Sequence, residues 1–147
     1  MGIQIDHIPF FGGFDLGFWS YPITILWIVG ISNALNFIDG VDGLAGSVTT
    51  INSITLAIIA LAMVPPNSII ALIGFILAGS MLAFLTYNFN PAKIFMGDSG
   101  ALFAGFLLAT ISITGVMKAA TLAILLPFIV LAVPIVDITY SSLRRIF

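Results

Sequence analysis

Two short segments of this 147-residue chain hold most of the side chains that could do chemistry. The segments are residues 33–45 and 88–100, and both are rich in glycine, which lets a ligand approach the backbone closely. Carboxylates, amides and an ammonium group together suit a divalent cation and an anionic ligand such as a phosphate. The side chains in question are Asn33, Asn36, Asp39, Asp42, Asn88, Lys93 and Asp98.

The first segment could form a polar edge. If a helix continued through it, Asn33, Asn36 and Asp39 would lie at three-residue steps on one face, and Asp42 would extend the series. This spacing predicts a ligand-binding edge. The alternative is structural, with both aspartates in a loop at a helix junction and Asp42 capping the next helix. A calcium-binding EF-hand loop is not supported, because its ligand spacing and closing glutamate are absent.

The second segment contains a turn of small residues, 96–100, directly before an apolar run. The turn places Asp98 near a helix N-terminus, which favours anions. Asp98 is therefore a candidate Mg²⁺ ligand, because Mg²⁺ takes one or two carboxylates and fills its shell with water and phosphate oxygens. A helix cap is the alternative. Lys93 either neutralises a phosphate or extends to the membrane interface, and Asn88 and Asn90 either bind a ligand or shape the Asn-Pro turn.

The composition describes a membrane protein. Apolar residues make up 61% of the chain and charged residues 7%, against about 25% charged in soluble domains. A soluble globular domain, a disordered tail and a nucleic-acid-binding protein are therefore excluded. The absence of cysteine excludes disulfides and thiolate chemistry, and the single histidine, His7, excludes a multi-histidine metal site.

The elements that must position these side chains are membrane helices. A helix crosses the hydrocarbon layer in roughly 20 mostly apolar residues, and five segments qualify. We predict an all-α, polytopic membrane helix bundle that forms a single domain over residues 1–147. The predicted spans are 21–38, 44–64, 68–87, 100–117 and 120–143.

The links between these spans predict how the bundle lies in the membrane. If successive spans cross the membrane in opposite directions, both polar segments and the C-terminal tail lie on the same face of the membrane. That face carries Lys93, Arg144 and Arg145, whereas the other carries Lys118. The excess of basic residues predicts a multi-pass protein of the cell membrane with its polar loops in the cytoplasm. The stretch 1–20 would then lie outside.

The two polar segments also resemble a known family. Asn-Ala-Leu-Asn-Phe-Ile-Asp-Gly-Val-Asp-Gly-Leu-Ala at 33–45 and Asn-Phe-Asn-Pro-Ala-Lys-Ile-Phe-Met-Gly-Asp-Ser-Gly at 88–100 resemble the polyprenyl-phosphate N-acetylhexosamine-1-phosphate transferases, of the glycosyltransferase 4 type. The likeness is greatest to the undecaprenyl-phosphate GlcNAc-1-phosphate transferase branch. The resemblance implies a membrane enzyme that transfers a sugar-1-phosphate from a UDP-sugar to a polyprenyl phosphate, needs Mg²⁺ (with Mn²⁺ as an alternative ion) and releases UMP.

The resemblance also implies residue roles. Asp98 matches the family's Mg²⁺-binding aspartate, and Asp39 and Asp42 match an aspartate pair on the nucleotide-sugar side, so these three are the candidate catalytic residues. The implied partners are UDP-N-acetylhexosamine, polyprenyl phosphate and the membrane, with no nucleic acid and a homodimer left open. Phe95 matches a family residue that lies against the uracil, and Asn33 is added because of the helical spacing. The candidate substrate-binding residues are Asn33, Asn36, Asn88, Lys93 and Phe95.

The chain departs from the family pattern in three places. Ala101 stands where the family usually has a serine, and neither the family's earlier aspartate pair nor its histidine-rich loop is found. We therefore interpret the chain as an internal fragment of a longer enzyme. The alternative is a non-catalytic or split membrane subunit that binds substrate without turnover. A piece of a transporter is a further reading, although no inverted repeat supports it.

Overall fold

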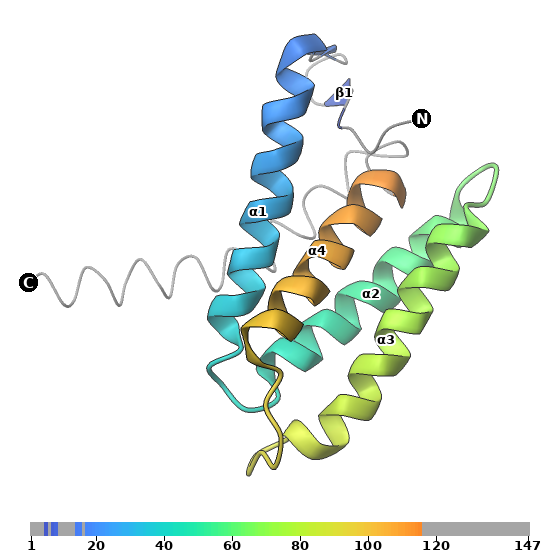
Figure 1. Ribbon diagram of the computed structural model, residues 1–147. Helices are drawn as coiled ribbons and strands as arrows, with labels where there is room; N and C mark the ends of the chain where they lie inside the picture. Colours follow the sequence, from blue (N-terminus) through green and yellow to red (C-terminus); the bar gives the residue numbers. More distant parts are fainter. Residues whose placement is uncertain (1–4, 6, 9–13, 16, 116–147) are drawn as a thin grey trace, which may run out of the picture.

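The computed structural model describes residues 5, 7–8, 14–15 and 17–115, and its main part is a bundle of four helices (Figure 1). These are α1 (Ser20–Ile38), α2 (Leu44–Ala62), α3 (Ser68–Asn88) and α4 (Gly97–Gly115). Before them come a short antiparallel pair, β1 (His7–Ile8) and β2 (Phe14–Asp15), with His7 opposite Asp15, and the 3-10 helix η1 (Gly17–Trp19).

All four long helices are long and apolar enough to cross a membrane. The predicted helical membrane bundle is therefore confirmed over the described residues, and three of the four spans found there differ from prediction by at most two residues at either end. The fourth helix begins at Gly97, before the predicted start at 100, because the small residues of the turn already form its first helical turn. The fifth predicted span, 120–143, lies outside the described residues.

The far end of the bundle holds the short turn between α2 and α3. Residues 64–66 are Val-Pro-Pro, and proline cannot continue a helix because it lacks the backbone N–H. Asn67 then starts α3, since its side chain accepts a 3.3 Å hydrogen bond from the Ile70 N–H. The turn thus sets α2 and α3 antiparallel and side by side.

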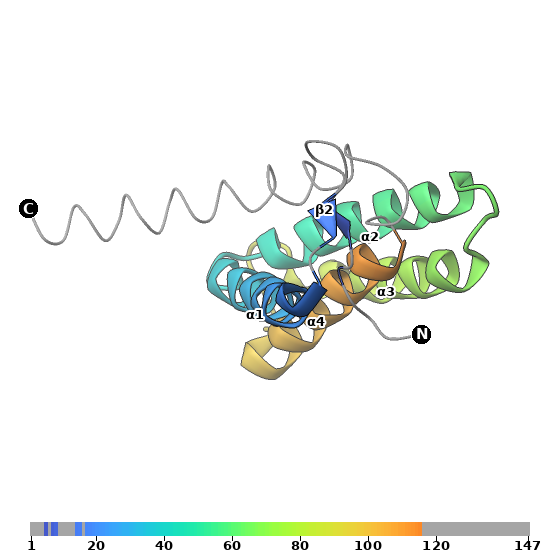
Figure 2. The same cartoon turned by 90° about the horizontal axis from the view of Figure 1, so that it is seen from above.

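The helices pack as two pairs, α1 with α4 and α2 with α3, and α4 also contacts α2 (Figures 1 and 2). Small residues allow close approach within each pair. A Cβ atom on Gly105 of α4 would lie 2.6 Å from the Ser32 Cα of α1. The same pair is joined by a 3.0 Å hydrogen bond from Trp27 Nε1 to Ser112 Oγ.

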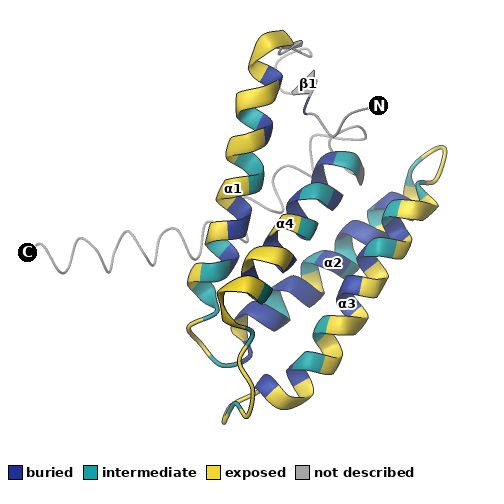
Figure 3. Cartoon of the chain, in the orientation of Figure 1, coloured by how far each residue is buried: buried dark blue, intermediate teal, exposed yellow. Residues whose placement is uncertain are grey.

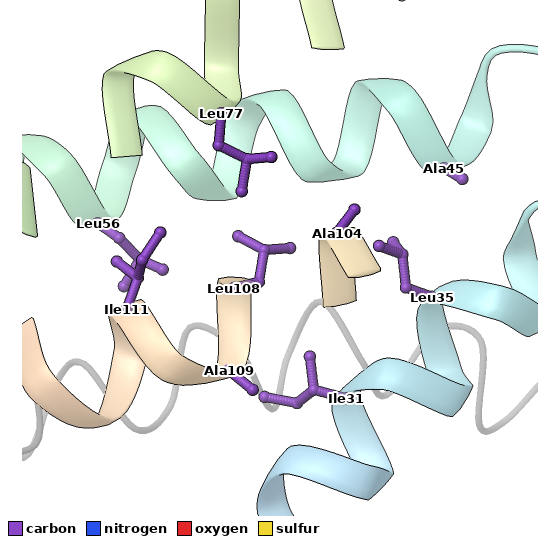
Figure 4. Packing of buried hydrophobic residues seen from close by; sticks show 9 residues of the cluster. All are labelled: Ile31, Leu35, Ala45, Leu56, Leu77, Ala104, Leu108, Ala109 and Ile111. Carbon is purple, nitrogen blue, oxygen red and sulfur yellow. The ribbon is translucent and has the colours of Figure 1, made fainter. Parts of the chain in front are cut away.

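The apolar core lies between the two pairs, and residues of all four helices meet in it (Figure 4). Exposed residues follow the outward faces of the helices (Figure 3). Many of them are large and apolar, as expected for surfaces that contact lipid or further helices. The core residues are Ile31, Leu35, Ala45, Leu56, Leu77, Ala104, Leu108, Ala109 and Ile111.

Candidate functional site

The two polar segments meet at one end of the bundle. α1 and α3 end there and α2 and α4 begin there, whereas β1 lies near the other end (Figure 1). Every charged residue between 17 and 115 lies in these loops or in the first turn of α4. We call residues 39–43 the first loop and residues 89–96 the second loop. The two loops, together with Gly97 and Asp98, are called the polar end. The predicted convergence of the two segments is confirmed.

Two acids of the polar end act on each other's charge: Asp39, which follows α1, and Asp98, in the first turn of α4. The Gly97 N–H donates a hydrogen bond to the Asp39 carboxylate. Burial raises the pKa of Asp39 above its ordinary value, the Gly97 bond opposes this rise, and the charge of Asp98 adds to it. Two carboxylates from distant segments are therefore held within reach of each other's charge.

The Asp98 side chain is exposed, and no hydrogen bond from the described part of the chain reaches its carboxylate. Gly97 opens α4 with a φ of +67°, a conformation that glycine adopts without strain. The first backbone N–H groups of a helix lack partners within it and favour anions. Asp98 thus stands beside a helix N-terminus with its oxygens available to a ligand.

The placement of Asp42 corrects the sequence prediction. α1 ends at Ile38, so Asp42 does not extend the helical series, and Gly43 rather than Asp42 is the N-cap of α2. The Asp42 Oδ2 atom instead accepts hydrogen bonds from Asn90 Nδ2 at 3.2 Å and from the Ala92 N–H at 3.1 Å. The carboxylate joins the two loops.

Asn88 makes the second connection between the loops, and its side chain is only 4% exposed. Its Oδ1 atom accepts a 3.0 Å hydrogen bond from the Gly43 N–H, and its Nδ2 atom donates a 2.9 Å bond to the Ile94 carbonyl. Gly43 has a φ of +74°, and a Cβ atom there would lie 3.2 Å from the Phe89 ring. Glycine is thus favoured at this position both by conformation and by space.

The two asparagines of α1 have different surroundings. Asn33 is exposed, and its amide donates a 2.8 Å bond to the Val29 carbonyl in the same helix. Asn36 is half-buried, and its Oδ1 atom is fully buried with no hydrogen-bond partner among the described residues. Because an unpaired buried carbonyl is costly, Asn36 is the better candidate of the two for a ligand contact.

Lys93 and Phe95 both extend from the second loop into solvent. Lys93 is exposed and forms no ion pair with the described residues. Phe95 is 72% exposed, which leaves its ring open for stacking. From the sequence, Asn90 either binds a ligand or shapes the Asn-Pro turn. Its hydrogen bond to Asp42 cannot be deduced from the spacing of residues along the chain.

Two of the three acids at the polar end, Asp39 and Asp98, are candidates to bind one divalent cation. No group of three metal-binding side chains exists among the described residues, so Asp42 does not join Asp39 and Asp98 in one cluster. Two carboxylates nevertheless fit Mg²⁺, which takes its remaining ligands from water and phosphate oxygens. The polar end also has three carboxylates against one ammonium group, an excess of negative charge that a cation would balance.

The family model for glycosyl transferase family 4 matches residues 1–116, which include both loops and Asp98. The chain belongs to glycosyl transferase family 4. A Bacillus subtilis protein named as a probable undecaprenyl-phosphate N-acetylglucosaminyl 1-phosphate transferase is 46% identical over 99% of this chain and 41% of its own length. The resemblance noted from the two motifs is confirmed.

Other relatives match a smaller part of the chain. Phospho-N-acetylmuramoyl-pentapeptide-transferases of Levilactobacillus brevis and Chloroflexus aggregans are 40% and 38% identical, each over 73% of this chain. The matches cover 32% and 29% of those proteins. The chain therefore spans less than half the length of these curated relatives.

Proposed function

We propose that this chain carries the nucleotide- and metal-binding part of a site that transfers N-acetylhexosamine-1-phosphate from a UDP-sugar to undecaprenyl phosphate. GlcNAc-1-phosphate is the expected group, which the name of the Bacillus subtilis relative supports. The observation that carries the proposal is the pairing of Asp39 with Asp98 at the polar end of a membrane-type bundle. The site would face the cytoplasm, as the distribution of basic residues predicts.

The reaction joins two anionic groups. An oxygen of the lipid phosphate attacks the β-phosphorus of the UDP-sugar and forms a new P–O bond. The bond between the β-phosphorus and the bridging oxygen breaks, and UMP leaves with that oxygen. Mutual repulsion of the phosphates is the main obstacle, so a site for this reaction has to supply positive charge.

Asp98, with Asp39 beside it, would hold the metal in this proposal. When bound, Mg²⁺ neutralises phosphate charge and stabilises the leaving group, and Mn²⁺ would suit the same oxygen ligands. Asp42 would stay outside this pair, because its Oδ2 atom is bonded to the second loop.

The remaining groups of the polar end would bind the nucleotide sugar. The exposed ammonium of Lys93 would pair with a phosphate, and the backbone N–H groups that follow Gly97 at the start of α4 would donate hydrogen bonds to a second anionic oxygen. The exposed ring of Phe95 would stack on the uracil, as the family resemblance implies. The unpaired Oδ1 atom of Asn36 would accept a hydrogen bond from the ligand.

Binding and turnover can be measured separately. The chain would be placed in nanodiscs with undecaprenyl phosphate, and UDP-GlcNAc affinity measured by calorimetry with and without Mg²⁺, alongside UMP release. We expect Mg²⁺-dependent binding that Asp98→Asn weakens by about tenfold or more, the effect of losing a charged ligand. Asn52→Ala is the control, because Asn52 bonds only within α2.

The outcomes separate the alternatives. UMP release would support a site that is complete in this chain, whereas Mg²⁺-dependent binding without release would support a partial site or a split subunit. Tighter binding of UDP-MurNAc-pentapeptide than of UDP-GlcNAc would contradict the proposed sugar. If neither nucleotide sugar binds, the proposal is wrong.

A further inference from the structure

Asn90 lies in the second loop and touches an acid of the first. Its Nδ2 atom donates to Asp42 Oδ2 at 3.2 Å, and the Ala92 N–H donates to the same oxygen at 3.1 Å. Pro91, between these donors, has no N–H of its own. The Asn-Pro-Ala sequence therefore presents one side-chain and one backbone donor to a single carboxylate oxygen.

The next residue of the first loop is held as well. The Gly43 N–H is bonded to Asn88, and the Phe89 ring packs where a Gly43 side chain would otherwise be. Asp42 and Gly43 are thus hydrogen-bonded to three residues of the second segment, Asn88, Asn90 and Ala92. The loops are joined by side chains as well as by the helices that carry them.

The other ends of the same two loops carry the acid pair. Asp39 begins the first loop, and its carboxylate accepts the Gly97 N–H that directly precedes Asp98. A shift of the first loop relative to the second would therefore change how Asp39 and Asp98 lie. A displacement of about 1 Å at a reacting group can cost about 100-fold in rate.

We propose that Asn90 is a positioning residue that acts through Asp42, and that their hydrogen bond holds the two loops in the register that keeps Asp39 beside Asp98. The inference rests on the proposed function, because the alignment of the two loops affects ligand binding only if the acid pair takes part in that binding. From the sequence, Asp42 is among the candidate catalytic residues. In this proposal Asp42 instead helps to align Asp39 and Asp98 and does not belong to that pair.

Two variants and their combination test the inference in the full chain in nanodiscs. We expect Asn90→Ala to weaken Mg²⁺-dependent UDP-GlcNAc binding about tenfold, the effect of one hydrogen bond to a charged group. Asn90→Asp should weaken it further, because two carboxylates would then face each other. The exchange Asp42→Asn with Asn90→Asp restores one amide and one carboxylate, and should recover affinity to within about threefold of the original chain. Asn52→Ala is again the control.

A ligand-independent measurement accompanies the affinities. The chain has no cysteine, so spin labels can be attached at Val41→Cys and Ile94→Cys, one exposed position in each loop. The distribution of label-to-label distances should broaden in Asn90→Ala and narrow again in the exchange variant. Mass spectrometry confirms labelling at both sites.

Each result decides something. Unchanged affinity in Asn90→Ala, an unchanged distance distribution, or an exchange variant as weak as Asn90→Asp would each overturn the inference. If the original chain binds no nucleotide sugar while Asn90→Ala still broadens the distribution, the proposed function fails and the loop-holding bond stands.

Discussion

The side chain of Asn88 holds the backbone N–H of Gly43 at 3.0 Å, 45 residues earlier in the chain. Gly43 precedes α2 and Asn88 ends α3, so this hydrogen bond closes the α2–α3 hairpin at the polar end. The same amide also fixes the Ile94 carbonyl of the second loop. One buried side chain therefore ties together both helices and the loop that leads to Asp98.

We expect Asn88→Ala to lower the free energy of unfolding by about 2 kcal/mol, because a backbone donor and a backbone acceptor lose their partner. Thermal unfolding in detergent would measure the loss. Asn52→Ala, which removes an amide bonded to the Val48 carbonyl within α2, should change the melting temperature far less. Equal effects of the two variants would show that the connection between the loops adds no stability.

Gly105→Ala should disrupt the packing of α1 on α4. The new methyl group would lie 2.6 Å from the Ser32 Cα and 3.1 Å from the Ile31 carbonyl oxygen, and backbone atoms cannot turn aside as a side chain can. Overpacking of this kind costs about 1–3 kcal/mol. Gly79→Ala is the matched control, because a Cβ there meets nothing within 4 Å. A melting temperature that is the same in both variants would contradict the predicted clash.

Stability should depend on pH through Asp39. Its pKa is raised in the folded state, so the folded chain binds this proton more tightly than the unfolded chain does. The contribution is fully present below the ordinary pKa and is lost as pH rises through the raised value. We expect Asp39→Asn in EDTA to melt at a higher temperature than the original chain at pH 7, with a difference that shrinks on acidification. A difference that grows on acidification would show that the sign is wrong.

Mg²⁺ should stabilise the folded chain. A ligand at about ten times its Kd adds about 1.4 kcal/mol to the free energy of unfolding. The melting temperature should therefore rise with MgCl₂, and the rise should disappear in Asp98→Asn. NaCl at matched ionic strength controls for screening of the acids. An equal rise in Asp98→Asn would place the ion elsewhere.

Much of this arrangement could be predicted from the sequence. Long apolar segments with few charges indicate which parts of the chain cross the membrane as helices. The predicted starts of α1, α2 and α3 therefore lie within one residue of the observed starts. Alternation of the helices then brings Asp39 and Asp98 to the same end. These features depend on length and hydropathy alone, which is why no tertiary information was needed.

The interactions of Asp42, Asn88 and Asn90 could not be predicted in the same way. Helical spacing placed Asp42 on the face of Asn36 and Asp39, but α1 ends at Ile38 and the backbone turns there. The partners of the Asp42 carboxylate lie 48 and 50 residues away. Such long-range hydrogen bonds follow from how the loops fold over each other, and no local pattern carries that information.

The separation of charge along the bundle also bears on how the α2–α3 hairpin enters a bilayer. Its turn, residues 63–67, has no charged side chain, whereas the opposite end is flanked by Asp42 and Lys93. A charged side chain at the centre of a bilayer costs about 2.5–3.5 kcal/mol on insertion scales. Entry with the turn leading therefore moves no charge through hydrocarbon, and the reverse direction moves both. The hairpin therefore has one inexpensive direction of insertion, in which the turn at residues 63–67 enters the bilayer first.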